Sequence, residues 1–442
     1  MIRLKLGDFD DSDVAYMAET VAACRKSASL GFPYDFYAPG GSYGDGWWSL
    51  DFALILSGAK WLDPRSAKTM AQNFFAAQCP DGRVKLWAYD DLPGIAAGGD
   101  VYAEKVGVSA LPKWFDALYG IARRTADEAF LADTLAFFEK NLDWWFSARL
   151  DGATGLVTAA FEETFPAYLG HKGEYAPPDT NTEVAAGCLY ASRLARRLGQ
   201  TQKAERYASM AKNLQNAVND RLWNEKTGAY QALNVKTHTF DPFFGAFTFA
   251  PLRFAAAPRE RRERLKVLLT DDDVFGFASH PLTSVARTDP AFTVTHGDYR
   301  GNASWSGSVW MTHNETAVRG LADCREDALA GLLAYKTLAT FRKNAVEFAD
   351  PFTGEGHGVK RYGWTAALWL SLLVETLFGV KEDAWTGALE ASPKMPKALA
   401  KEAYLHGLPL ADGGFLDVDV RYGEATCTVR TSDTSPVAVR PL

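Results

Sequence analysis

Apolar side chains recur at helical spacing along most of the chain. Val14, Met17 and Val21 lie at positions i, i+3 and i+7 behind the acidic residues Asp10 and Asp11, which favour the start of a helix. The same period predicts twelve helices, at residues 11–30, 47–61, 64–79, 109–124, 127–149, 181–198, 202–221, 242–253, 258–270, 306–321, 325–343 and 362–378.

The predicted helices alternate in character. Every second one, such as 306–321 or 362–378, is richer in glycine, alanine and aromatic residues, and 47–61 is apolar nearly all round. Those between them, such as 202–221 and 325–343, are more amphipathic and carry charged faces. A helix that is apolar on all sides is buried, and an amphipathic helix covers a core with one face. The alternation therefore predicts inner helices that are covered by outer helices.

The connections between the helices also alternate in length. Those that follow an inner helix are short, around Asp63 and at 125–126, 199–201, 254–257 and 322–324. Those that follow an outer helix are long, at 31–46, 80–108, 150–180, 222–241, 271–305 and 344–361. In antiparallel helix pairs all the long loops lie at one end, and loops of that length are usually functional. We interpret the chain as an all-α (α/α)6 barrel, a toroid of six helical hairpins with a funnel of loops at the N-terminal ends of the inner helices. Two stacked bundles or an open solenoid are the alternatives.

The C-terminal region has a different pattern. From Leu408 on, apolar and polar residues alternate around glycine and proline turns, as in LDVDV at 416–420. Such alternation is typical of an antiparallel sheet with one buried face. We expect residues 1–400 to form the barrel domain and residues 401–442 a small β-rich appendage that packs on it.

The charge balance narrows the classes of partner. Lys and Arg number 47 against 54 Asp and Glu, a net charge of −7, so no basic excess exists to neutralise nucleic acid phosphates. No apolar run approaches the roughly 18 residues that a membrane helix needs. The N-terminus lacks the apolar core of a signal peptide, and the five cysteines are scattered without a CxxC spacing. We therefore expect a reduced, cytoplasmic protein with no metal site, no nucleic acid partner and no membrane association, whose oligomeric state stays open.

The aromatic content points to a carbohydrate partner. The chain has 13 Trp, 17 Tyr and 27 Phe, and aromatic faces stack on the C–H faces of sugar rings. The first long loop leads into Trp47, Trp48 and Asp51, the combination of ring and carboxylate that a sugar subsite needs. Core tryptophans with a capping aspartate are the alternative. The second long loop adds Trp87 and Tyr89 as further candidates.

The third long loop contains the adjacent residues Glu162 and Glu163, flanked by phenylalanines. Apolar surroundings raise a carboxyl pKa by desolvation, which suits a general acid at neutral pH. Neighbouring residues of an extended chain point in opposite directions, so we expect one glutamate to face the funnel and the other to bind structure. A purely structural role for both is the alternative. Asp179 and Asn181 could cap the sixth helix, and Asp179 is a third candidate acid.

The fifth and sixth long loops supply further candidates. Tyr299, Arg300, Trp305 and Trp310 alternate polar groups with rings. Arg300 could clamp a substrate carboxylate, or it could pair with a loop carboxylate. Glu347 lies between two apolar residues, and a second buried carboxylate at this position would be a general base.

Loops three and six of a six-fold ring face each other across the funnel. Two carboxylates on either side of a sugar carry out glycoside hydrolysis: a gap of about 6.5–9.5 Å admits a water and gives inversion, and about 5 Å gives retention. Opposite walls favour the wider gap. No HExxH or P-loop motif occurs, and the seven histidines show no ligand spacing, so metal and nucleotide chemistry are not indicated.

Two motifs resemble glycoside hydrolase family 63 and its mannosylglycerate-hydrolase-like relatives. EFADPFTGEGHGVKRYGWTAALWLSLL at 347–373 is similar to their E-x-Y-x-P-x-T-G-E pattern followed by W-[ST]-x-A-L. SWSGSVWMTHNETAVRGL at 304–321 is similar to their Y-W-R-G-x-x-W-x-x-x-N pattern. The resemblance implies an (α/α)6 barrel and an inverting, exo-acting mechanism without a cofactor.

The resemblance also implies roles for particular residues. Glu347 takes the position of the general base. Aligning the prolines puts Glu163 at the position of the family's acid, which is an aspartate there, with Glu162 as the fallback. Ser306 replaces the arginine of the W-R-G motif, so that contact is missing or is supplied by Arg300.

The resulting hypothesis is an inverting, exo-acting α-glycosidase, α-glucosidase-like, that hydrolyses a small α-linked glycoside such as a disaccharide or a glycosylglycerate. Glu163 would be the acid and Glu347 the base. The alternatives are a sugar epimerase or isomerase on the same barrel, a polysaccharide lyase, and a non-catalytic carbohydrate-binding protein, among which a barrel alone does not decide. The expected pocket residues are Trp47, Trp48, Asp51, Trp305, Trp310 and Trp364.

Overall fold

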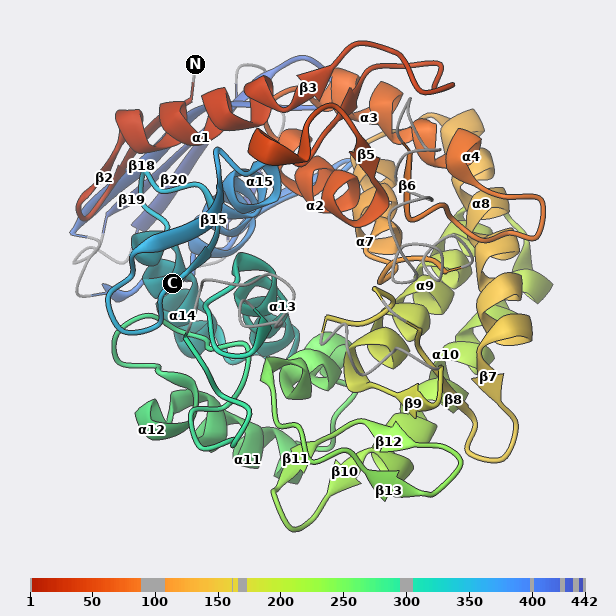
Figure 1. Cartoon of the computed structure of the whole chain (residues 1–442). Helices are drawn as coiled ribbons and strands as arrows, with labels where there is room; N and C mark the ends of the chain where they lie inside the picture. Colours follow the sequence, from red (N-terminus) through yellow and green to blue (C-terminus); the bar gives the residue numbers. More distant parts are fainter. Residues whose placement is uncertain are drawn as a thin grey trace.

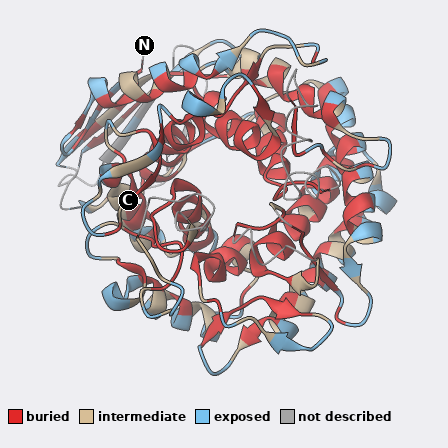
Figure 2. Ribbon diagram, in the orientation of Figure 1, coloured by how far each residue is buried: buried red, intermediate tan, exposed pale blue. Residues whose placement is uncertain are grey.

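The computed structural model describes residues 2–88, 108–160, 162–165, 173–294, 305–397, 401–421, 426–431 and 437–439. Helices in this part of the chain form two concentric layers around an open centre, as Figure 1 shows. The inner layer is buried almost throughout, whereas the outer layer is exposed on its far side (Figure 2). The predicted mainly helical fold is confirmed.

The helices of the two layers follow one another alternately along the chain. The outer ones are α1 (Asp11–Ala23), α3 (Pro64–Ala71) with α4 (Asn73–Ala77), α8 (Glu128–Ala148), α10 (Thr201–Arg221), α11 (Arg259–Thr270) and α14 (Asp327–Thr340). The inner ones are α2 (Ser49–Ala59), α7 (Trp114–Arg123), α9 (Pro178–Arg197), the 3-10 helix η3 (Ala246–Ala255), α13 (Met311–Asp323) and α15 (Gly363–Ser371), which continues into the π-helical turn η6 (Leu372–Leu377).

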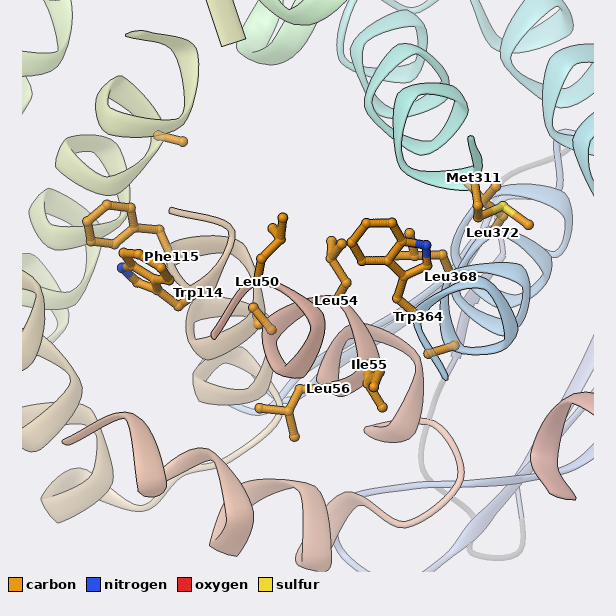
Figure 3. Close-up of a cluster of buried hydrophobic side chains, with 14 of the residues drawn as sticks. Leu50, Leu54, Ile55, Leu56, Trp114, Phe115, Met311, Trp364, Leu368 and Leu372 are labelled. Atoms are coloured by element: carbon orange, nitrogen blue, oxygen red, sulfur yellow. The ribbon is translucent and has the colours of Figure 1, made fainter. Parts of the chain in front are cut away.

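The inner helices contact one another in sequence. α2 contacts α7, α7 contacts α9, α9 contacts η3, η3 contacts α13, α13 contacts α15, and α15 contacts α2. α2 and α15 approach so closely that a Cβ on Gly58 would lie 1.9 Å from the carbonyl oxygen of Ala367. Leu54, Trp364 and Leu368 fill the space around this contact (Figure 3). None of the helices in the described ranges has the length and apolarity that crossing a bilayer requires.

Local chemistry explains where several helices begin and end. Asp63 accepts a hydrogen bond from the backbone N–H of Ser66 at 3.0 Å, and Pro64 is the first residue of α3. The helix expected at 242–253 is instead η3, which contains Pro251 and departs from helical backbone angles at Arg253. A proline inside a helix removes an N–H donor and clashes with the preceding turn, which accounts for this difference.

Strands from both ends of the chain form one sheet. Its order is β2-β1-β18-β19-β20, all antiparallel, with β1 (Arg3–Leu6), β2 (Phe9–Asp10), β18 (Glu402–Pro409), β19 (Phe415–Arg421) and β20 (Thr426–Thr431). A second sheet joins β16 (Val380–Asp383), β17 (Ala388–Ala391) and β21 (Val437–Val439). The domain boundary at residue 400 stays a prediction, and strands from both sides of it share these sheets.

Short strands also tie the long connections together. Two of these pairs border the site described below: β5 (Trp47–Trp48) with β6 (Trp87–Ala88), and β14 (Val346–Ala349) with β15 (Gly356–Lys360). The others are β3 (Arg25–Lys26) with β4 (Phe36–Tyr37), β7 (Leu150–Asp151) with β8 (Leu156–Val157), β10 (Trp223–Asn224) with β11 (Ala229–Tyr230), and β9 (Tyr175–Ala176) with β12 (Leu233–Asn234) and β13 (Thr239–Phe240). The short elements η1 (Gly41–Tyr43) and α12 (Asp272–Phe275) complete the connections.

A buried ionic cluster joins four inner elements. Lys113 Nζ lies 2.6 Å from Glu183 Oε1 of α9 and 3.7 Å from Glu315 Oε2 of α13. Arg253 of η3 donates two hydrogen bonds to Asp116 of α7, at 3.0 and 2.9 Å. All five residues are buried, and the carboxylates raise the pKa values of Lys113 and Arg253 against the effect of burial. The charges therefore remain paired inside the helical ring.

Candidate active site

Glu347 lies on β14, with both carboxylate oxygens held by neighbouring donors. Oε1 accepts a hydrogen bond from Tyr43 O–H at 2.9 Å, and Oε2 accepts one from the backbone N–H of Val359 at 3.1 Å. Burial raises the pKa of Glu347, and the two hydrogen bonds oppose that shift. Gly358 has φ +69° and a Cβ there would lie 2.5 Å from Glu347 Oε2, so the hairpin needs glycine at this position.

Asp51 lies in the first turn of α2 and is linked electrostatically to Glu347. Its Oδ1 accepts a hydrogen bond from Tyr362 O–H at 2.7 Å. Burial raises the pKa of Asp51 to about 7, the bond from Tyr362 opposes the shift, and the charges of Glu347 and Glu162 add to it. Because the charges of Glu347 and Glu162 both act on Asp51, the three carboxylates share one region of the structure.

Glu162 and Glu163 are adjacent in the chain but differ in environment. Glu162 is half-buried and has φ +68°, a backbone conformation that costs a non-glycine residue roughly 1–2 kcal/mol. Its carbonyl oxygen accepts a hydrogen bond from the N–H of Leu111 at 2.9 Å, which holds this turn in place. Strained backbone of this kind is found preferentially at functional sites.

Glu163 is fully enclosed and makes four hydrogen bonds. Arg149 donates from Nε to Oε2 at 2.7 Å and from Nη2 to Oε1 at 2.9 Å. The backbone N–H of Ser109 donates to Oε1 at 2.9 Å and that of Ala160 donates to Oε2 at 2.8 Å. The four donors occupy both carboxylate oxygens. Glu163 therefore has the surroundings of a structural anchor.

Asp179 and Asn181 anchor the same segment to α9. Asp179 is buried and accepts hydrogen bonds from Thr164 Oγ1 at 2.8 Å and from the N–H of Phe165 at 2.8 Å. Asn181 Oδ1 accepts from the N–H of Val157 at 2.8 Å, and its Nδ2 donates to the carbonyl of the same residue. Both lie in the first turn of α9 rather than at its N-cap, which is Pro177.

A series of ring contacts, the aromatic belt, connects the elements around these carboxylates. Successive centroids lie between 3.7 and 6.0 Å apart, and the closest pair, Trp305 and Trp310, is stacked. Trp48 and Trp305 are half-exposed, whereas Trp310 and Trp364 are buried. The belt runs in the order Trp87, Trp48, Tyr43, Tyr362, Trp364, Trp310, Trp305 and Phe165.

Three predicted pocket residues lie outside the described residues, and one lies in the core. Tyr89, Tyr299 and Arg300 belong to the ranges that are not described. Trp47 is fully buried against Phe32, Phe52 and Phe74, which matches the core role that the sequence left open as an alternative.

Sequence reasoning missed the two tyrosines that hold the carboxylates, Tyr43 and Tyr362. The first long loop contains three tyrosines, Tyr34, Tyr37 and Tyr43, and nothing in the pattern distinguished Tyr43. Tyr362 lies two residues before Trp364, inside the motif at 347–373, and this position was its available signal.

Carboxylates in desolvated surroundings beside sugar-stacking rings are the machinery of glycoside hydrolases, and this combination indicates an enzyme of that class. The chain belongs to the family described by the mannosylglycerate hydrolase MGH1-like glycoside hydrolase domain, whose model matches residues 44–164 and 160–365. This match places the chain among the mannosylglycerate-hydrolase-like members of the glycoside hydrolases.

Relatives in sequence agree with this membership, and solved structures share the fold. The mannosylglycerate hydrolases of Rubrobacter radiotolerans and Thermus thermophilus are 27% identical over 188 residues and 31% identical over 151 residues. These alignments cover 42% and 34% of this chain, and 40% and 34% of the relatives. The GH63 mannosylglycerate hydrolase from a second strain of Thermus thermophilus, in complex with Tris and D-glycerate, has a TM-score of 0.66 at 19% identity, over 81% of this chain and 99% of that one. A sialidase structure has a TM-score of 0.75 at 15% identity, over 98% of this chain and 40% of that one. At these identities the structures show a shared fold.

Proposed function

We propose that the chain is an (α/α)6 barrel that acts as an inverting, exo-acting α-glycosidase on a small α-linked glycoside. The continuous series of contacts among the inner helices supports the barrel. Because two relatives are mannosylglycerate hydrolases, an α-mannoside or α-glucoside of a small acceptor such as glycerate is the first substrate class to test.

The observation that carries the proposal is the setting of Glu347. Its two oxygens are held by Tyr43 and by the backbone of Val359, which fixes the orientation of the carboxylate. These hydrogen bonds oppose the rise in pKa that burial causes, so they favour the carboxylate form that a general base requires. In the proposed mechanism Glu347 removes a proton from the water that attacks the anomeric carbon.

Glu162 is the general acid in this proposal, in place of Glu163. Glu163 has both oxygens committed to four donors and is fully enclosed, so it has no free lone pair for a substrate. Glu162 is half-buried and its charge reaches Asp51. It would protonate the glycosidic oxygen as the bond to the anomeric carbon breaks.

Asp51 has a supporting role in the same proposal. With a pKa of about 7 it is largely protonated in a weakly acidic solution, so it can both donate and accept a hydrogen bond. We assign it to a sugar hydroxyl, with Tyr362 fixing its orientation from the other side.

The test is a hydrolysis screen of α- and β-linked disaccharides and glycosylglycerates, with the released anomer followed by NMR. An inverting enzyme releases the β-anomer from an α-linked substrate. We expect Glu347→Gln and Glu162→Gln each to lower kcat by about 10²–10⁴-fold. Glu355→Gln is the matched control, since this exposed residue lies in the turn of the same hairpin as Glu347.

The two variants should differ in whether a substrate with a better leaving group restores their turnover. A dinitrophenyl glycoside needs little protonation of its leaving group, so it should recover turnover in Glu162→Gln and leave Glu347→Gln inactive. Release of the α-anomer from an α-linked substrate, or full activity of Glu347→Gln, would contradict the proposal.

A further inference from the structure

His313 lies in the first turn of α13, beside the aromatic belt. Its ring contacts Phe165 edge to face at 5.0 Å and Trp305 at 5.8 Å. Phe165 and Trp305 are themselves stacked, at 5.7 Å. Only 4% of His313 is exposed, so the imidazole is enclosed by the wall of the candidate site.

The ring nitrogens of His313 are polar atoms without a partner. No hydrogen bond or ion pair joins them to any residue in the described ranges. Neither nitrogen is fully enclosed by the described residues. Thr312 Oγ1 and Asn314 Oδ1, on the neighbouring residues of α13, are fully enclosed. The small exposure of His313 therefore includes its ring nitrogens.

The protonation state of His313 suits recognition of a neutral hydroxyl. Burial lowers the pKa of His313 to about 3, and the charge of Lys113 acts in the same direction. A neutral imidazole has one N–H donor and one bare nitrogen acceptor, the pair that a sugar hydroxyl can satisfy. A buried polar group that stays unpaired costs folding free energy, whereas a bound hydroxyl would remove that cost.

We infer that His313 is a specificity-determining residue that hydrogen-bonds one sugar hydroxyl at the bottom of the site. This inference rests on the proposed glycosidase function and adds a contact that none of the sequence motifs assigns. His313 takes no part in proton transfer. Its contribution is to binding and to discrimination between sugars that differ at that hydroxyl.

The experiment measures binding of D-glucose, D-mannose and their monodeoxy derivatives by calorimetry, for the wild type, His313→Phe and His313→Gln. We expect the wild type to bind one deoxy sugar about 10-fold more weakly than its parent. His313→Phe should bind the parent and that deoxy sugar equally weakly, and should bind the other deoxy sugars with the same loss as the parent. His313→Gln keeps a donor and an acceptor and should recover part of the affinity. The difference between wild type and His313→Phe should stay constant from pH 5 to pH 8, since the imidazole does not titrate there.

Several outcomes would overturn the inference. The first is that His313→Phe binds the parent sugar as tightly as the wild type does. The second is that the wild type and His313→Phe discriminate equally among the deoxy sugars. The third is that the wild type binds none of the sugars. Thermal unfolding of both variants shows whether a loss of sugar affinity comes from misfolding. If His313→Phe is misfolded, the affinities of His313→Gln for the parent and deoxy sugars test the inference instead. Sugar binding with the expected pattern but no hydrolysis of any glycoside would refute the proposed function and leave the His313 contact standing.

Discussion

The adjacent residues Glu162 and Glu163 should respond in opposite ways to substitution. Each oxygen of Glu163 accepts two hydrogen bonds, so glutamine would place an amide NH2 against two donors whichever way it turned. The variant would also leave Arg149, whose side chain is 19% exposed, without its counter-charge. Removing one partner of a buried pair costs about 3–5 kcal/mol, and the partial exposure of Arg149 favours the lower end. We expect Glu163→Gln to lose about 3 kcal/mol of unfolding free energy.

Glu162 should matter more for activity than for stability. Its side chain is half-buried, so Glu162→Gln should change the unfolding free energy by less than about 0.5 kcal/mol while lowering activity. Glu162→Gly also releases the strain at φ +68° and should stabilise the fold by up to about 1 kcal/mol. A gain in stability combined with a loss of activity is the signature of a strained functional residue.

Urea unfolding followed by tryptophan fluorescence measures the stabilities, and hydrolysis of a natural and a dinitrophenyl glycoside measures the chemistry. The reasoning is refuted if Glu163→Gln is as stable as the wild type and recovers turnover only on the dinitrophenyl substrate. That result would make Glu163 the proton donor and Glu162 dispensable.

Three further predictions follow from the contacts around the site. Tyr43→Phe removes a hydrogen bond that lowers the pKa of Glu347, so the acidic limb of kcat/KM against pH should move to higher pH. An unchanged limb would show that the ionisation of Glu347 does not cause it. Burial raises the pKa of Asp51 from 3.8 to about 7, so its contribution to stability is present below pH 3.8 and is lost as pH rises through 7. The stability of the wild type relative to Asp51→Asn should therefore fall by up to about 1.4 kcal/mol per pH unit in that window, and a constant difference in urea unfolding from pH 4 to pH 8 would exclude it. Lys113→Met removes the nearer of the two cations beside Glu183, with Arg253 remaining at 3.9 Å, and should cost about 3 kcal/mol. Part of the loss should be recovered in Lys113→Met/Glu183→Gln, and strictly additive losses in the double variant would argue against direct pairing.

The helical layers were predictable because burial repeats with the period of the helix. Alternation between amphipathic and apolar helices located the inner and outer elements, and the cap at Asp63 followed from local chemistry. The sheet was only partly predictable. Strand β1 pairs with β18 across almost the whole chain, and no local pattern at residues 3–6 indicates a partner that distant.

The candidate site was predictable in its residue types and less so in its geometry. The sequence indicated that Glu162 and Glu163 would face different ways, and their surroundings do differ. Which of them binds structure depends on Arg149, which lies at the end of α8 and carries no sequence signal of a partner. Aligning the prolines pointed to Glu163 from spacing along the chain alone. Such spacing does not record the direction in which a backbone turn points each side chain.

The stacked pair of Trp305 and Trp310 gives the protein an optical signal of its own. The two indoles lie 3.7 Å apart with an angle of 5° between their planes, close enough for their electronic transitions to couple. Coupled transitions produce near-ultraviolet circular dichroism whose sign and size depend on the mutual orientation of the rings. Trp305 is the half-exposed member of the pair, so a sugar that contacts it would alter the spectrum and report occupancy of the site without any label.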